Sequence, residues 1–146
     1  MKRIVIDANI GLAWVLNLPY SQQVEELMKR WQKEQVILAV PMLWQYEVVS
    51  GLHRSMMLNL LPQANLLPAL AAINGTAIDL IAPSSETDWL ALQWARRLDQ
   101  HKVYDAQYLS LAEQLSAEFW TADQRLANRA DQLGLSWVHW VCETLL

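Results

Sequence analysis

The sequence predicts an α/β fold, a three-layer α/β/α sandwich in which a five-stranded parallel sheet is covered by helices on both faces. Five short apolar runs alternate with helical patterns along the chain, which is the order of consecutive β–α units. A length of 146 residues favours one domain over residues 1–146, because two domains of half this size would each have a poor core. Apolar residues make up 53% of the chain, enough for one core.

The predicted strands are short and apolar on both faces, as strands buried in a parallel sheet are. The first ends in an aspartate, Pro41 stops the second, and Pro83 follows the third. In chain order they cover residues 3–8, 36–40, 76–82, 117–121 and 135–140.

Helical periodicity fills the segments between these strands. Ser21 is a plausible N-cap for a helix whose apolar side chains recur at helical spacing, and either Ser84 or Ser85 caps a later one. Pro62 opens a helix that Asn74 and Gly75 end. We expect a short helix or turn at 9–17 and helices at 21–34, 42–58, 62–73, 84–98, 103–115 and 123–133.

Composition limits the classes of function. The net charge of −4 is a poor match to a protein that grips nucleic acid across a broad basic face. The single cysteine, Cys142, excludes an internal disulfide and is expected to be a buried thiol. The apolar run before Asp7 is too short for a signal peptide, and no stretch has the apolar length of a membrane span. We therefore expect a cytoplasmic protein without membrane contact.

Eight tryptophans exceed what so small a core usually buries, so some are expected at an interface.

Four carboxylates are the candidate functional residues. Asp7 ends the first strand and Asp123 follows the fourth, and the carboxyl ends of parallel strands meet at one rim. Asp105 starts the helix before the fourth strand. Glu47 is a lone acid on a largely apolar helix, which directs it inward. Taken singly, each has a structural explanation as a turn residue, helix cap, first-turn acid or solvated side chain.

Taken together, the four acids indicate a cation site. Carboxylates about 5 Å apart repel each other by about 3 kcal/mol per pair at an effective dielectric near 20. Protonation would relieve this repulsion, and a hard divalent cation such as Mg²⁺ or Mn²⁺ would relieve it better. Asn9 and Thr121 lie two residues from Asp7 and Asp123, where they either support a carboxylate or water, or serve as a turn amide and a strand-end hydroxyl.

At these residues the chain resembles the PIN-domain family, particularly the VapC-type toxins of prokaryotic toxin–antitoxin pairs. The resemblance covers nearly the whole length and rests on four motifs in the family's order, namely Ile-Val-Ile-Asp-Ala-Asn at 4–9, Pro-Met-Leu-Trp-Gln-Tyr-Glu-Val at 41–48, Tyr-Asp-Ala-Gln-Tyr-Leu-Ser-Leu-Ala-Glu at 104–113 and Thr-Ala-Asp-Gln-Arg-Leu at 121–126. It implies the strand order 3-2-1-4-5 and an acidic quartet of Asp7, Glu47, Asp105 and Asp123. It also implies cleavage of RNA with Mg²⁺ or Mn²⁺, a homodimer, and an antitoxin that covers the active site.

Further residues allow two interpretations each. Arg125 and Arg129 contact substrate phosphates at the pocket rim, or are solvated surface charges. A basic patch before Asp105 flanks the pocket or simply ends a helix, and it comprises Arg96, Arg97, His101 and Lys102. An apolar partner groove or ordinary core packing explains Trp14, Trp44, Met56 and Met57.

Two other classes of protein are alternatives to the ribonuclease toxin. A phospho-receiver domain would carry an adjacent acid pair after its first strand and a late strand-end lysine, and this chain has neither. A non-catalytic PIN-like RNA-binding protein is the remaining alternative.

Overall fold

The structure is a computed structural model that describes residues 1–145. Its core is a five-stranded parallel sheet in the order β3-β2-β1-β4-β5, as expected. The strands are β1 (Arg3–Ile6), β2 (Ile37–Pro41), β3 (Asp79–Ile81), β4 (Glu118–Thr121) and β5 (Val138–Trp140).

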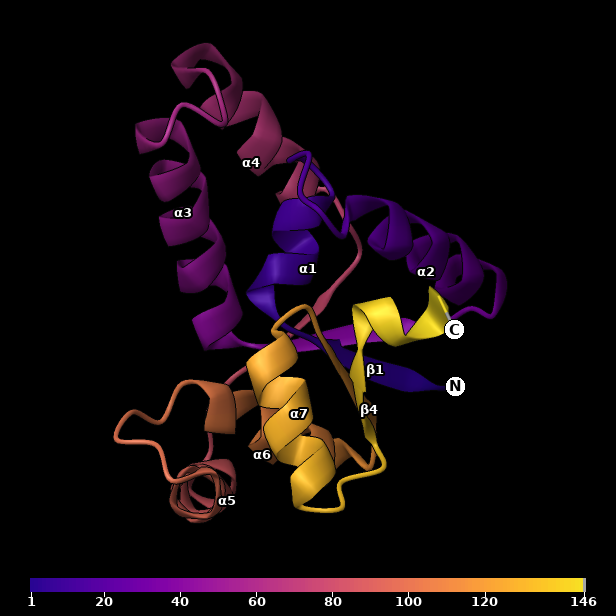
Figure 1. Cartoon of the computed structure of the whole chain (residues 1–146), viewed down its shortest axis with the longest axis vertical. Coiled ribbons are helices and arrows are strands. Elements are labelled where there is room, and N and C mark those ends of the chain that lie inside the picture. Colours follow the sequence, from indigo (N-terminus) through magenta and orange to yellow (C-terminus); the bar gives the residue numbers. More distant parts are fainter. Residues whose placement is uncertain (146) are drawn as a thin grey trace.

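Helices cover both faces of the sheet, which confirms the three-layer sandwich. Figure 1 shows α1 to α4 on one side and α5 to α7 on the other. The α-helices are α1 (Ala8–Ala13), α2 (Ser21–Lys33), α3 (Met42–Met57), α4 (Leu66–Asn74), α5 (Ser85–Leu98), α6 (Asp105–Leu115) and α7 (Gln124–Gln132), and the two 3-10 turns are η1 (Gln63–Asn65) and η2 (Val141–Leu145). In the described part of the chain, none of the helices combines the length and apolar character that a bilayer-spanning segment requires.

The centre of the core lies where β1 crosses α6. The side chains of Ile4, Val5 and Ile6 are fully buried, because helices pack on both faces of this central strand. Helix α6 packs against β1, β2 and β4, and its Ala106 and Leu109 are also fully buried. The first turn of α6 is thereby fixed beside the carboxyl ends of β1 and β4.

Several elements differ in detail from the sequence expectations. The helix expected at 62–73 is divided into η1 and α4, and the one expected at 103–115 begins at Asp105. Ser21 does not cap α2, because its hydroxyl accepts from the Leu18 N–H and donates to the Leu16 carbonyl, each at 2.8 Å. This serine closes the turn before the helix instead. Cys142 is half-buried rather than buried.

The tryptophans are divided between core and surface. Trp31, Trp44, Trp94 and Trp120 are buried, whereas Trp89 is 62% exposed. Trp44 packs against Trp14 with ring centroids 6.0 Å apart, so this pair belongs to the core and not to a partner groove.

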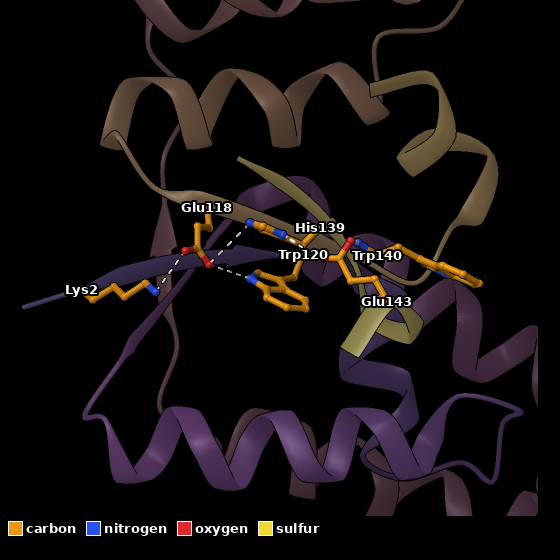
Figure 2. Close-up of polar contacts among 6 residues, drawn as sticks. All are labelled: Lys2, Glu118, Trp120, His139, Trp140 and Glu143. Carbon is orange, nitrogen blue, oxygen red and sulfur yellow. Dashed lines mark hydrogen bonds and ion pairs between the residues drawn. The ribbon is translucent and has the colours of Figure 1, made fainter. Parts of the chain in front are cut away.

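A polar cluster joins the start of the chain to its C-terminal segment (Figure 2). Glu118 pairs with Lys2 at 3.1 Å and accepts from the Trp120 indole at 3.0 Å, and His139 contacts Glu143 at 2.6 Å. Burial acts against ionisation of Glu118, but these hydrogen bonds and the nearby positive charge outweigh it and lower its pKa. Because Glu118 begins β4, this cluster fixes the end of the strand that is remote from Asp7 and Asp123.

Candidate active site

The structure brings all four predicted acids to one hollow, which we call the acidic hollow. Its volume is about 250 Å³, and it opens beyond the carboxyl ends of β1 and β4. The remaining lining residues are Ala8, Asn9, Leu12, Ser50, Gly51, Arg54 and Tyr108.

Asp7 is the most buried of the four acids, with 7% of its surface exposed. It directly follows β1 and caps α1, where its Oδ1 accepts from the Ile10 N–H at 3.2 Å. Its Oδ2 accepts from the Thr121 hydroxyl and from the Ala122 N–H at 3.1 Å. Burial and the charge of Asp123 raise its pKa to about 6, although these hydrogen bonds oppose the rise.

Thr121 links Asp7 to Asp123. This fully buried threonine donates its hydroxyl proton to Asp7 and accepts from the Asp123 N–H at 2.9 Å. The Oδ1 of Asp123 caps α7 by accepting from the Arg125 and Leu126 N–H groups at 2.9 and 3.2 Å. Its Oδ2 has no hydrogen bond to the described residues and remains available at the hollow.

Glu47 is half-buried, but not for the reason that the sequence suggested. Of its apolar neighbours Val48 is buried, but Tyr46 and Val49 are 70% and 49% exposed, so the apolar sequence around Glu47 does not by itself bury it. Glu47 is positioned by the buried Tyr108, whose hydroxyl donates to its Oε1. Burial raises the pKa of Glu47 against the effect of this hydrogen bond, and the charge of Asp105 adds to the rise. Burial and the charge of Glu47 together raise the pKa of Tyr108, which remains a donor.

Asp105 begins α6, and a side chain from the preceding loop holds it. The Gln100 amide donates to its Oδ2 at 3.0 Å. Burial raises the pKa of Asp105, the Gln100 hydrogen bond partly opposes this, and the charge of Asp123 adds to it. Three acids of the hollow therefore favour their protonated forms more than free side chains do.

The four acids of the hollow have the chemistry to hold a divalent cation. Four mutually repelling carboxylates are the hard oxygen donors that Mg²⁺ and Mn²⁺ prefer. In the described residues, however, no three acidic, histidine or cysteine side chains are already arranged to hold a metal ion. The donor set fits the cation in chemistry, and its oxygen atoms are not yet gathered around one point.

Comparison with known proteins identifies the family. The sequence model of the PIN domain matches residues 4–132, which is most of the chain. The chain belongs to the PIN domain family. PIN domains are generally nucleases. No curated protein shows significant sequence similarity to this chain.

Solved structures share the fold of this PIN domain at low sequence identity. PAE2754 from Pyrobaculum aerophilum matches with a TM-score of 0.69 and 21% identity over 99% of this chain and 86% of its own. A toxin–antitoxin complex from Klebsiella pneumoniae gives 0.61 and 17% over 92% and 94%. VapBC2 from Rickettsia felis, bound to a promoter DNA fragment, gives 0.60 and 13% over 94% and 96%.

Of the other residues that the sequence predicts for the site, some line the acidic hollow of this PIN domain and others lie outside it. Asn9 lines the hollow with an exposed side chain. Arg125 is exposed and does not line it. Arg129 lies over the end of α5, where its guanidinium donates to the Arg97 carbonyl and to Gln132, each at 3.2 Å.

Sequence reasoning missed three residues that shape the hollow. Tyr108 and Gln100 hold two of the acids, and Arg54 is the only cationic side chain among the described lining residues. Helical spacing carried a signal for two of them, because Tyr108 lies three positions after Asp105, and Arg54 lies two helical turns after Glu47.

Proposed function

We propose that this PIN domain is a Mg²⁺- or Mn²⁺-dependent endoribonuclease of the cytoplasm that hydrolyses RNA phosphodiester bonds. The observation that carries the proposal is the convergence of Asp7, Glu47, Asp105 and Asp123 on one solvent-open hollow of a PIN domain. Three of these acids have raised pKa values, chiefly because they are buried, and perturbed carboxylates gathered in a hollow are typical of functional sites.

Asp7 and Asp105 are the acids that we assign to holding the cation. Thr121 and two backbone N–H groups keep Asp7 in place, and Gln100 keeps Asp105 in place. The Oδ1 atom of each carboxylate still has a lone pair for a ligand, since that of Asp7 accepts one hydrogen bond and that of Asp105 none from the described residues. Bound there, a divalent cation would offset the charge of the hollow, attract the RNA phosphate and lower the pKa of a bound water.

Glu47 and Asp123 are the candidates for accepting the proton of the attacking water. The free Oδ2 of Asp123 is one acceptor, and the raised pKa of Glu47 brings its basicity closer to neutral pH. Tyr108 aims Glu47 by donating to Oε1, so its second oxygen remains available. Asn9 at the rim is placed to hold a water or a phosphate oxygen.

The test is cleavage of a fluorescently labelled pool of ten-nucleotide single-stranded RNAs of random sequence. Wild-type protein is expected to cut the pool with Mn²⁺ or Mg²⁺ and to stop with EDTA. Asp7→Asn is expected to lower the rate at least about a thousandfold, because it removes the anchoring charge of the cation site. Asp79→Asn is the matched control, since Asp79 is an exposed acid outside the hollow. Cleavage that survives EDTA and Asp7→Asn unchanged would contradict the assignment.

We further propose that the chain is the toxin of a toxin–antitoxin pair and forms a homodimer. Structures of the same fold include toxin–antitoxin complexes. Four apolar side chains are 57% to 75% exposed where α3 meets α4, a surface that suits an antitoxin, and they are Met57, Leu58, Leu60 and Leu67. Light scattering should give twice the chain mass of 16.8 kDa for the isolated protein. A small protein encoded beside it should bind it and suppress RNA cleavage.

One observation favours the alternative, a PIN-like RNA-binding protein without turnover. The described acids are not pre-arranged around a metal position. In the same assay this alternative predicts tight binding of the RNA pool in EDTA and no product with Mn²⁺.

A further inference from the structure

A second hollow adjoins the acidic hollow, and we call it the flanking hollow. Its volume is about 470 Å³, and Glu47 and Asp105 line both hollows, so the two share a wall. Away from this wall, the flanking hollow is lined by basic and aromatic side chains instead of acidic ones. The full lining is Glu47, Gln100, His101, Lys102, Tyr104 and Asp105.

The loop that carries the basic and aromatic residues is fixed at its base. Asp99 adopts a left-handed conformation with φ of 56°, which lets its N–H and that of Gln100 bond to carbonyls of the last turn of α5. The Gln100 side chain then ties the loop to Asp105 at 3.0 Å. His101, Lys102 and Tyr104 are thereby held beside an acid of the proposed catalytic centre.

The positive charge of Lys102 is not paired with an acid of the described residues. Lys102 and His101 are exposed, and neither forms an ion pair with the described residues, unlike Lys2 and Lys29. In a chain with a net charge of −4, this unpaired lysine is the side chain of the flanking hollow that can contact a phosphate, opposite the acids Glu47 and Asp105 of the shared wall.

Tyr104 adds a surface for stacking. Its side chain is 54% exposed, and its ring stacks on no other aromatic ring of the described chain. Exposed aromatic rings beside a cation are the elements with which proteins bind unpaired nucleotides, the ring stacking on the base and the cation contacting the phosphate.

We propose that the flanking hollow binds the nucleotide next to the scissile phosphate of single-stranded RNA. Tyr104 stacks on its base, and Lys102, with His101, contacts its phosphate. A base paired in a duplex cannot turn onto Tyr104, so the site selects unpaired RNA. This inference rests on the proposed ribonuclease function and adds the binding site that positions the strand.

The experiment measures kcat and KM for the same RNA pool with Mn²⁺. Tyr104→Ala is expected to raise KM about tenfold with kcat within about twofold, because it removes one stacking contact. Tyr104→Phe is expected to restore the wild-type KM, since the ring is retained. Lys102→Ala is expected to raise KM and to reduce the slope of log kcat/KM against log salt by about 0.7. Trp89→Ala and Lys33→Ala, exposed residues that line neither hollow, are the controls and should leave both constants unchanged.

The outcomes separate this inference from the function on which it rests. Annealing the pool to its complement should abolish most cleavage. If wild type cleaves and Asp7→Asn does not, but Tyr104→Ala and Lys102→Ala keep the wild-type KM, the flanking hollow is not a nucleotide site and the ribonuclease proposal stands. A fall in kcat alone would mean that the substitutions disturb Asp105, which also overturns the inference. Absence of cleavage by wild type overturns both.

Discussion

Three acids of the hollow are each held by a side-chain donor from a different part of the chain. Thr121 of β4 holds Asp7, Tyr108 of α6 holds Glu47, and Gln100 of the α5–α6 loop holds Asp105. A donated hydrogen bond fixes a carboxylate without neutralising it. The charge is therefore left for a ligand. Without a ligand, burial makes these carboxylates take up protons more readily than free ones, although the hydrogen bonds oppose this.

This predicts how Asp7 affects stability in EDTA-treated protein. The folded-state pKa of Asp7, about 6, lies above the ordinary value of 3.8. The contribution of Asp7 to the free energy of unfolding is therefore full below pH 3.8 and is lost as the pH rises through about 6. Between about pH 4 and pH 7.5 the free energy of unfolding of wild type should fall relative to that of Asp7→Asn by up to about 3 kcal/mol. Urea unfolding at both pH values measures this difference. Equal pH dependence in the two proteins would refute it, and Asp79→Asn should behave as wild type.

The sequence predicts the acids better than it predicts their partners. Asp7 and Asp123 follow from strand ends that meet at one rim, and this reasoning needs only the element order. The contact between Tyr108 and Glu47 spans 61 positions and joins α6 to α3. No local pattern encodes such a pairing, so the donor that positions Glu47 becomes visible only in the folded chain.

At the scale of elements, the close approach of α1 and α3 sets the entrance of the hollow. A Cβ atom on Gly11 would lie 2.5 Å from the Trp44 ring, and one on Gly51 would lie 2.4 Å from a terminal methyl group of Leu12. The Trp44 indole donates to the Asp7 carbonyl at 2.9 Å, so the ring that touches α1 also holds the first acid. Two glycines thus let the helix that Asp7 caps lie against the helix that carries Glu47.

Gly11→Ala should therefore damage stability and activity together. The buried Trp44 cannot rotate away without losing its hydrogen bond to Asp7, so we expect a loss of about 1–3 kcal/mol in the free energy of unfolding. We also expect RNA cleavage to fall about tenfold or more, because the displaced ring would move Asp7. Gly51→Ala is the matched comparison, and its loss should be smaller because the Leu12 side chain can change rotamer. Urea unfolding and the RNA assay rank the two variants, and the reverse order would contradict this account.

Element boundaries were predicted best at the centre of the sheet. The first strand, expected at 3–8, is β1 at Arg3–Ile6, and the fourth, expected at 117–121, is β4 at Glu118–Thr121. The edge strands are shorter than their apolar patterns, since 76–82 yields only Asp79–Ile81. An edge strand has a hydrogen-bonding neighbour on one side only, so fewer residues stay in register than the pattern suggests.

At the scale of the whole molecule, the acidic hollow exists only in the complete fold. Asp7 follows β1, Glu47 lies on α3, Asp105 begins α6 and Asp123 caps α7, so unfolding separates all four. A cation that these acids bind is therefore bound by the folded state and not by the unfolded chain. Such a ligand shifts the folding equilibrium toward the native protein by mass action.

Thermal unfolding should consequently depend on Mg²⁺ concentration. At a hundredfold excess over its dissociation constant, a ligand specific to the folded state adds about 2.7 kcal/mol, which raises Tm by roughly 5–10 °C in a chain of this size. Asp105→Asn should reduce this shift strongly, because it removes one of the two acids assigned to the cation. Asp79→Asn should keep the full shift, since that acid is exposed on β3 outside the hollow. NaCl at matched ionic strength controls for general screening. A Mg²⁺ shift of equal size in wild type and Asp105→Asn would place the cation elsewhere and remove the basis for the metal-dependent mechanism.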